Sequence, residues 1–257
     1  MVLLKREECG RLAPLYAGVQ ETPVWSCLQG IMGQAAADDA DAPRCAWIIV
    51  GDFCFPAGDP DAPEAAALLA ALPARFLILV PPDGAWARRI EEAFPGRSRR
   101  IERYAIQKEP GVFDRARLWR LVEALPAGYR LRRIDAEWYD TLLAQEWSRS
   151  FCENFDSKED FYRRGLGYIA LYGGEPVGGA SSYSVYRGGL EIEVDVQEPH
   201  RRKGIASACA ARLILACLER GWYPSWDAAT PVSVRLAEKL GYHLDAAYPA
   251  YEIRPDG

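Results

Sequence analysis

The feature that most constrains this chain of 257 residues is a short basic loop between a strand-like and a helix-like segment. Alternating apolar residues predict a strand over residues 190–196, and apolar residues at helical spacing predict a helix over residues 204–220. The first amides of a helix have no partners within it, and the helix dipole adds partial positive charge there. The loop therefore predicts an anion site suited to a phosphate group. Its residues are Arg201, Arg202, Lys203 and Gly204.

The helix after this loop has one apolar face, formed by residues that recur at i, i+3 and i+4. These residues are Ile205, Cys209, Leu213, Ala216 and Cys217. Neither a G-x-G-x-x-G nor a G-x-x-x-x-G-K-[ST] motif lies near the strand, so dinucleotide-binding and P-loop folds are excluded. A solvated basic turn that ends in a glycine is the alternative interpretation.

The loop resembles a known family signature. Residues 201–206 (RRKGIA) resemble the first signature of the GNAT superfamily of N-acetyltransferases, Q/R-x-x-G-x-G/A, and residues 233–242 (SVRLAEKLGY) are similar to its second. The resemblance extends to a subgroup that has an extra N-terminal domain and includes a zwittermicin-resistance-type acetyltransferase. The matching phrases lie at residues 51–55, 146–148, 179–184, 191–195 and 223–228. The resemblance covers nearly the whole chain and is strongest after Tyr129.

The resemblance implies a mixed α/β (α+β) fold, with a central, mostly antiparallel sheet flanked by helices and preceded by a small α/β domain. A Pro-Ala-Gly turn at residues 126–128 supplies the boundary. We therefore expect an N-terminal α/β domain of unknown role at residues 1–125 and a GNAT domain at residues 126–257. No internal repeat is evident, and residues 34–42 (QAAADDADA) predict a surface loop.

Periodicity predicts the individual elements of both halves. In the first half, strands are expected at residues 46–50 and 76–80, and helices at 63–72, 86–94 and 118–125. In the second half, strands are expected at residues 129–134, 167–171, 177–186, 190–196, 223–226 and 247–253, and helices at 137–148, 158–164, 204–220 and 232–240.

Three carboxylates lie on the strand before the loop. Glu191, Glu193 and Asp195 alternate along it, which places them on one face. Such a face should open on a polar cleft, and crowding should raise the pKa of at least one carboxyl. We expect Glu193 to be the general base for a protonated amine, directly or through a water, while Asp195 or Glu191 holds cationic groups of the substrate. The alternative is that these carboxylates form ion pairs with basic residues on neighbouring strands.

The resemblance also implies how acetyl-coenzyme A binds as cosubstrate. Main-chain groups of Val194, Asp195 and Val196 would pair with the pantetheine arm. The pyrophosphate would be held by Arg201, Arg202, Lys203, Gly204, Ile205 and Ala206. Thr230 stands where the family usually has asparagine, and Ser233 lies close to it in the sequence. The usual tyrosine acid is replaced by Ala237, so the thiolate leaves unassisted, or Ser233 or a nearby tyrosine serves as the acid.

Polar residues near the carboxylates are candidates for acceptor binding. Ser181, Ser182 and Tyr183 lie on the preceding strand, and Asp227 follows the strand at residues 223–226. A serine-rich strand is also compatible with a polar face that has no ligand. The acceptor is expected to be a primary amine of a small molecule or peptide. The acidic strand face favours a cationic acceptor such as a polyamine, an aminopolyol or an antibiotic.

Composition excludes several classes of protein. A formal net charge of −5 supplies no general positive field for nucleic acid. No apolar segment is long enough for a secretory signal or a membrane span, so no membrane partner is expected. Seven cysteines without a C-x-x-C pair indicate reduced thiols and a cytoplasmic location, with Cys209 and Cys217 buried and inert. His200 and His243 lack the spacing of metal ligands, so no metal is expected.

Two other functions are compatible with the sequence. The chain could be a non-catalytic sensor that binds acetyl-coenzyme A, which the alanine at position 237 would suit. It could also be an interaction protein whose working part is residues 1–125. The sequence does not indicate the oligomeric state or the identity of the acceptor.

Overall fold

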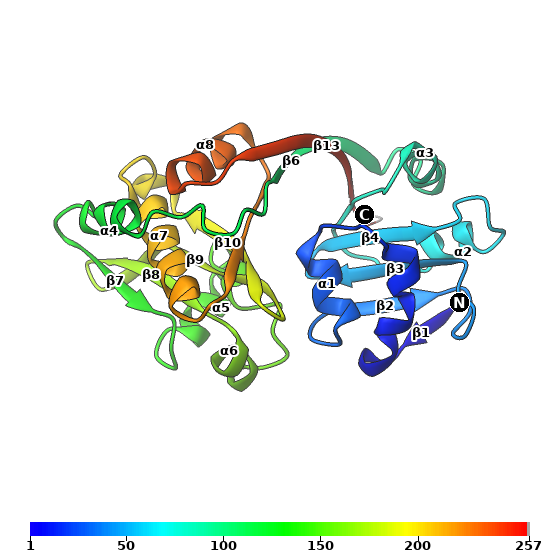
Figure 1. Ribbon diagram of the computed structural model, residues 1–257, viewed down its shortest axis with the longest axis horizontal. Coiled ribbons are helices and arrows are strands. Elements are labelled where there is room, and N and C mark those ends of the chain that lie inside the picture. Colours follow the sequence, from blue (N-terminus) through cyan, green and yellow to red (C-terminus); the bar gives the residue numbers. More distant parts are fainter. Residues whose placement is uncertain (256–257) are drawn as a thin grey trace. The chain divides into compact units, whose positions relative to one another are not determined.

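The computed structural model describes residues 1–255, which divide into two compact units. The first unit comprises Met1–Arg103 and the chain from residue 247 onward, and the second comprises Tyr104–Ala246. The chain passes between the units twice, within strand β6 (Ser98–Ile106) and within strand β13 (Leu244–Ile253) (Figure 1). The division precedes the expected boundary at residue 126. The reason is that helix α4 (Arg115–Glu123) packs against helix α7 (Ile205–Glu219) and so belongs to the second unit.

The first unit contains the strands β1-β2-β3-β4-β5-β13 in that order, and the sheet continues from β13 to β6 and β12. The strands β1 to β4 pair antiparallel, β4 and β5 pair parallel, and β13 pairs antiparallel with β5. The elements are β1 (Val2–Leu4), η1 (Arg6–Tyr16), α1 (Thr22–Leu28), β2 (Gln34–Ala37), β3 (Cys45–Val50), β4 (Phe53–Gly58), α2 (Ala65–Ala70), β5 (Leu77–Leu79) and α3 (Gly84–Ala93). Its core contains Trp86 and Ile90 of α3, packed with Leu77 and Leu79 of β5.

The surface loop expected at residues 34–42 is wrong for its first four residues. Gln34–Ala37 form β2, which lies between β1 and β3, and Ala35, Ala36 and Ala37 are fully buried. Pairing on both edges outweighs the weak strand preference of alanine. The rest of the segment is a turn, in which the Asp38 carboxylate accepts the amides of Arg44 and of Cys45, the first residue of β3.

The second unit is a sheet with strand order β11-β10-β9-β8-β7, in which β7 to β10 are antiparallel and β11 is parallel to β10. Helix α7 lies across the sheet and contacts β8, β9, β10 and β11 (Figure 1). The remaining elements are β7 (Tyr129–Arg133), α5 (Tyr139–Ala144), η2 (Arg149–Phe151), α6 (Lys158–Arg164), β8 (Gly167–Tyr172), β9 (Glu175–Tyr186), β10 (Gly189–Val196), η3 (Glu198–His200), β11 (Tyr223–Ser225), β12 (Asp227–Ala228) and α8 (Pro231–Leu240).

Both units follow one topology, although the sequence contains no evident repeat. Each has four antiparallel strands followed by a parallel fifth, with a helix between the fourth and fifth strands, α2 in the first unit and α7 in the second.

The loops before these two helices, α2 and α7, differ in charge. The loop before α2 contains Asp59, Asp61 and Glu64, whereas the loop before α7 contains two arginines and a lysine. An anion site at this position is therefore confined to the second unit.

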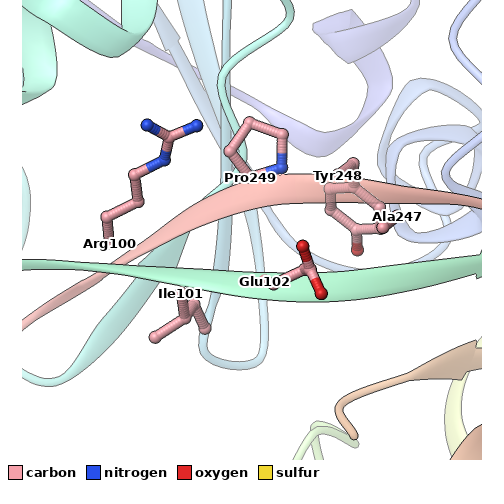
Figure 2. A pocket seen from close by; sticks show the side chains of 6 residues that line it. All are labelled: Arg100, Ile101, Glu102, Ala247, Tyr248 and Pro249. Carbon is pink, nitrogen blue, oxygen red and sulfur yellow. The ribbon is translucent and has the colours of Figure 1, made fainter. Parts of the chain in front are cut away.

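A hollow of about 460 Å³ lies beside β6 and β13 in the first unit. Figure 2 shows the two strands side by side, with Arg100 and Ile101 on opposite sides of β6. The other residues that line it are Glu102, Ala247, Tyr248 and Pro249. None of the residues expected in the site lines this hollow.

Candidate active site

Strand β10 separates from β11 after a short paired stretch. Gly189, Leu190 and Glu191 pair with β11, while β10 continues to Val196. The chain after β11 pairs elsewhere, because Asp227 and Ala228 join the end of β6. In the part of the chain that the structure describes, no residue of β11 pairs with residues 192–196 of β10. Such an edge can pair with an extended ligand, as in other cases of strand addition.

The anion loop, Arg201–Gly204, leads directly into α7. Gly204 is the N-cap residue with φ of 83°, and no side chain caps the helix. Arg202 has φ of 61°, so both residues adopt the left-handed conformation and the loop turns sharply. A Cβ built on Gly204 would meet no atom within 4 Å, so there is open space beside the first amides of the helix. These residues therefore fit a phosphate group.

The charges of the loop are arranged around the end of β10. The Arg201 side chain donates from Nε to the Val196 carbonyl at 2.9 Å, and its Nη2 lies 3.5 Å from Oδ1 of Asp195. Lys203 Nζ donates to the Pro199 carbonyl at 2.9 Å. Neither Arg202 nor Lys203 forms an ion pair with a described carboxylate. Arg201 thus ties the loop to the strand, while two positive charges remain available to an anion.

The start of α7 is held close to the sheet by a glycine that the sequence analysis did not single out. A Cβ at Gly178 of β9 would lie 2.9 Å from Cγ2 of both Ile205 and Val196. Only a glycine therefore lets the first residue of α7 pack against β10. The sequence does contain a sign of this packing, the Gly178-Gly179 pair inside a predicted strand. Glycine within a strand indicates that another part of the chain approaches closely.

The three carboxylates of β10 lie on the face opposite α7. Val196 packs against Ile205 of α7, so the alternate residues Glu191, Glu193 and Asp195 have the other face. Glu191 is 8% exposed, whereas Glu193 and Asp195 are half-buried. Their common face follows from the alternation of side chains along a strand. Asp195 contacts Arg201 of the anion loop, not a basic residue of a neighbouring strand.

The serines of β9 are turned toward the backbone. Ser181 is fully buried and donates to the Phe151 carbonyl at 2.7 Å. Ser182 accepts the Leu166 amide at 2.8 Å and lies 3.0 Å from the Leu166 carbonyl. Tyr183 is 7% exposed and occupies the position where the register of β9 and β10 shifts by one residue. The two serine hydroxyls connect the segment from η2 to β8 with the sheet.

The second signature forms helix α8 and its ends. Thr230 is the N-cap residue, and its hydroxyl accepts the Ser233 amide at 3.2 Å. Ser233 Oγ in turn accepts Trp226 Nε1 at 3.1 Å. Gly241 ends the helix at φ of 114°, and the amide of Tyr242 reaches back to the Ala237 carbonyl, as in a Schellman motif. Both hydroxyl groups therefore have structural partners, and Ala237 is fully buried.

The cysteines of α7 are buried, as expected. Burial raises the pKa of Cys209 and of Cys217 to about 12, so both thiols stay protonated and unreactive. Across residues 1–255, the structure has no group of three or more His, Cys, Asp or Glu that could hold a metal ion. Nor does this part of the chain contain a helix that is long and apolar enough to cross a bilayer.

The sequence profile of GNAT acetyltransferases matches residues 13–251, which include parts of both units. The chain belongs to the GNAT acetyltransferase family. Enzymes of this family use acetyl-coenzyme A and acetylate amines. The first signature of the family predicts that the coenzyme site lies in the second unit, at β10, the anion loop and the start of α7.

Relatives of the family agree with this assignment. A GCN5-related N-acetyltransferase-like protein from Streptococcus suis is 44% identical, with a TM-score of 0.91 over 98% of this chain and 100% of that one. An uncharacterized N-acetyltransferase of Bacillus subtilis, YdfB, is 32% identical over 129 residues, 49% of each chain. The chain thus spans about half the length of this curated relative. A tandem GNAT protein from the clavulanic acid pathway is 11% identical with a TM-score of 0.59, which shows a shared fold.

Proposed function

We propose that the second unit transfers an acetyl group from acetyl-coenzyme A to a primary amine of a small molecule or peptide. The observation that carries this proposal is the adjacency of two features, the edge of β10 beyond its pairing with β11 and the anion loop that begins α7. An acyl donor with an extended arm and a diphosphate needs both. The zwittermicin-resistance-type subgroup, with its additional N-terminal unit, is the part of the family that we favour.

The coenzyme would contact the chain at the residues expected from the signature. The amides of Gly204, Ile205 and Ala206, with the charges of Arg202 and Lys203, would hold the diphosphate. The main chain of Val194 would position the arm, whereas the Val196 amide and carbonyl are already bonded to the side chains of Asp195 and Arg201. We propose a different role for Asp195, because its carboxylate lies 3.5 Å from the Arg201 guanidinium. It would hold the loop in place rather than bind the acceptor.

Glu193 is the proposed general base. It lies on the face opposite α7, between the buried Glu191 and the Arg201-linked Asp195, and it is half-buried. A carboxylate in this position can accept the proton of an ammonium group, directly or through a water, and release the free amine for attack. The three carboxylates together favour a cationic acceptor, such as a polyamine, an aminopolyol or an antibiotic. No general acid is assigned, because the buried Ala237 cannot donate a proton.

Coenzyme binding is tested by calorimetry on a pair of glycine variants. Gly204 and Gly221 lie at opposite ends of α7, both have positive φ, and a Cβ at either would meet no atom within 4 Å. Gly204→Val should abolish coenzyme A binding, because the side chain would occupy the space beside the first amides. Gly221→Val imposes similar backbone strain far from the loop and should bind as the wild type does. Equal affinities in the two variants would refute the anion site.

Catalysis is tested by measuring release of free thiol from acetyl-coenzyme A with a panel of amines. Turnover with a polyamine or an aminopolyol supports the proposal. Tight coenzyme binding with no turnover on any amine would instead support a non-catalytic, coenzyme-sensing role, which the alanine at position 237 favours.

A further inference from the structure

An aromatic cluster lies beside the anion loop in the second unit. It consists of Tyr129, Tyr172 and His200. The Tyr129 hydroxyl lies 2.8 Å from Nδ1 of His200. The ring of Tyr172 lies 4.8 Å from that of Tyr129 and 5.4 Å from that of His200, measured between centroids. His200 ends η3 and is followed directly by Arg201, so the cluster is continuous with the anion loop.

Tyr172 is unusual among the tyrosines of this unit because it is exposed. Its exposure is 49%, whereas Tyr183 and Tyr242 are buried. The ring is nevertheless held in a defined position. Tyr129 packs against it, and a Cβ at Gly128 would lie only 3.3 Å from it. A fixed aromatic ring that is half in water is suited to stack against a planar ligand.

The cluster lies within reach of the diphosphate position. Strands β8 and β10 are both antiparallel to β9, so they end on the same side of the sheet, at Tyr172 and Val196. One strand separates them, which corresponds to roughly 10 Å. A ribose and a purine ring that extend from a diphosphate at the start of α7 can cover this span.

We propose that Tyr172 and His200 form the subsite for the adenine ring of the coenzyme. The inference rests on the proposed function, because it takes the diphosphate to bind at Arg201–Gly204. The anion loop would bind the phosphates, and the aromatic cluster would supply the face on which the base stacks. Stacking does not depend on hydrogen bonds to the edge of the base, and the Tyr172 hydroxyl is not required for it.

The test compares two ligands, coenzyme A and 4′-phosphopantetheine, which lacks the adenosine together with its 3′-phosphate and one phosphate of the diphosphate. The measured quantity is the ratio of their dissociation constants in competition experiments. Tyr172→Ala should reduce the preference for coenzyme A by about 5- to 150-fold, the range for loss of one stacked base. Tyr172→Phe should retain the wild-type ratio. Trp119→Ala removes another exposed ring of this unit, on α4, and should also leave the ratio unchanged.

The outcomes separate this proposal from the proposed function. A wild-type protein that binds no coenzyme A refutes the proposed function itself. A wild-type protein that binds coenzyme A, with an unchanged ratio in Tyr172→Ala, refutes only the adenine subsite. If Tyr172→Ala does not fold, Tyr172→Leu replaces it, because leucine keeps apolar cover over Tyr129 but has no aromatic face. An unchanged ratio in that variant is equally decisive against the subsite.

Discussion

Substitution of Gly178 by alanine should disturb both stability and coenzyme binding. The new Cβ would lie 2.9 Å from two methyl groups, Cγ2 of Ile205 and Cγ2 of Val196, and 3.3 Å from the Asp195 carbonyl oxygen. Carbon atoms in good contact are about 3.5–4.0 Å apart, so the start of α7 must move away from β10. Both methyl groups belong to β-branched side chains, which have little freedom to rotate. Overpacking of this kind costs about 1–3 kcal/mol.

The matched control is Gly84→Ala, at the first position of α3 in the first unit. The only neighbour of a Cβ there is Arg88 Nη1 at 3.9 Å, and the φ angle of Gly84 is not positive. Alanine in a helix is about 1 kcal/mol more favourable than glycine, so this variant should be as stable as the wild type or more so. Urea unfolding measures the stability, and calorimetry with coenzyme A measures the affinity. If Gly178→Ala matched the wild type in both measurements, the packing argument for the anion loop would be wrong.

Three further predictions concern single side chains. Glu193→Gln should lower kcat/KM by about 10²- to 10⁴-fold and leave coenzyme affinity near the wild-type value, and an unchanged rate would exclude Glu193 as the base. Burial opposes ionisation of Asp160, but Arg164 and Arg163 outweigh it and lower the pKa of that carboxyl to about 2. Asp160→Asn should therefore cost about 2 kcal/mol of unfolding free energy at neutral pH, and this difference should shrink as the pH falls below about 4 and disappear only below about 2. Cys209 and Cys217 should resist alkylation at pH 8 in the folded protein and react after unfolding, as mass spectrometry would detect.

Much of the fold could be predicted from the sequence, because the strongest patterns are local. Helix α6 has the predicted bounds, and β8, β10, α7 and α8 each lie within two residues of prediction, because their periodicity and end signals agree. The strand β2 was missed because three alanines carry almost no strand signal. Its burial comes from pairing with β1 and β3, which no local pattern reveals.

The candidate site was predictable only in part. The loop at residues 201–204 and the common face of the β10 carboxylates follow from spacing alone. The buried positions of Ser181 and Ser182 do not, because their partners, Phe151 and Leu166, are at least 15 residues away in the sequence. The aromatic cluster likewise joins residues from β7, β8 and η3, which only the sheet brings together.

The pairing of β5 with β13 has a consequence for synthesis on the ribosome. Leu79 of the first unit pairs with Tyr251, which is translated after the whole of the second unit. At about 5–20 residues per second, roughly 10 to 30 seconds separate the two residues during translation. Throughout that interval the edge of β5 that later receives β13 lacks its final partner, and an unpaired edge is open to wrong pairing. The first unit can therefore complete its sheet only after the second unit has been made.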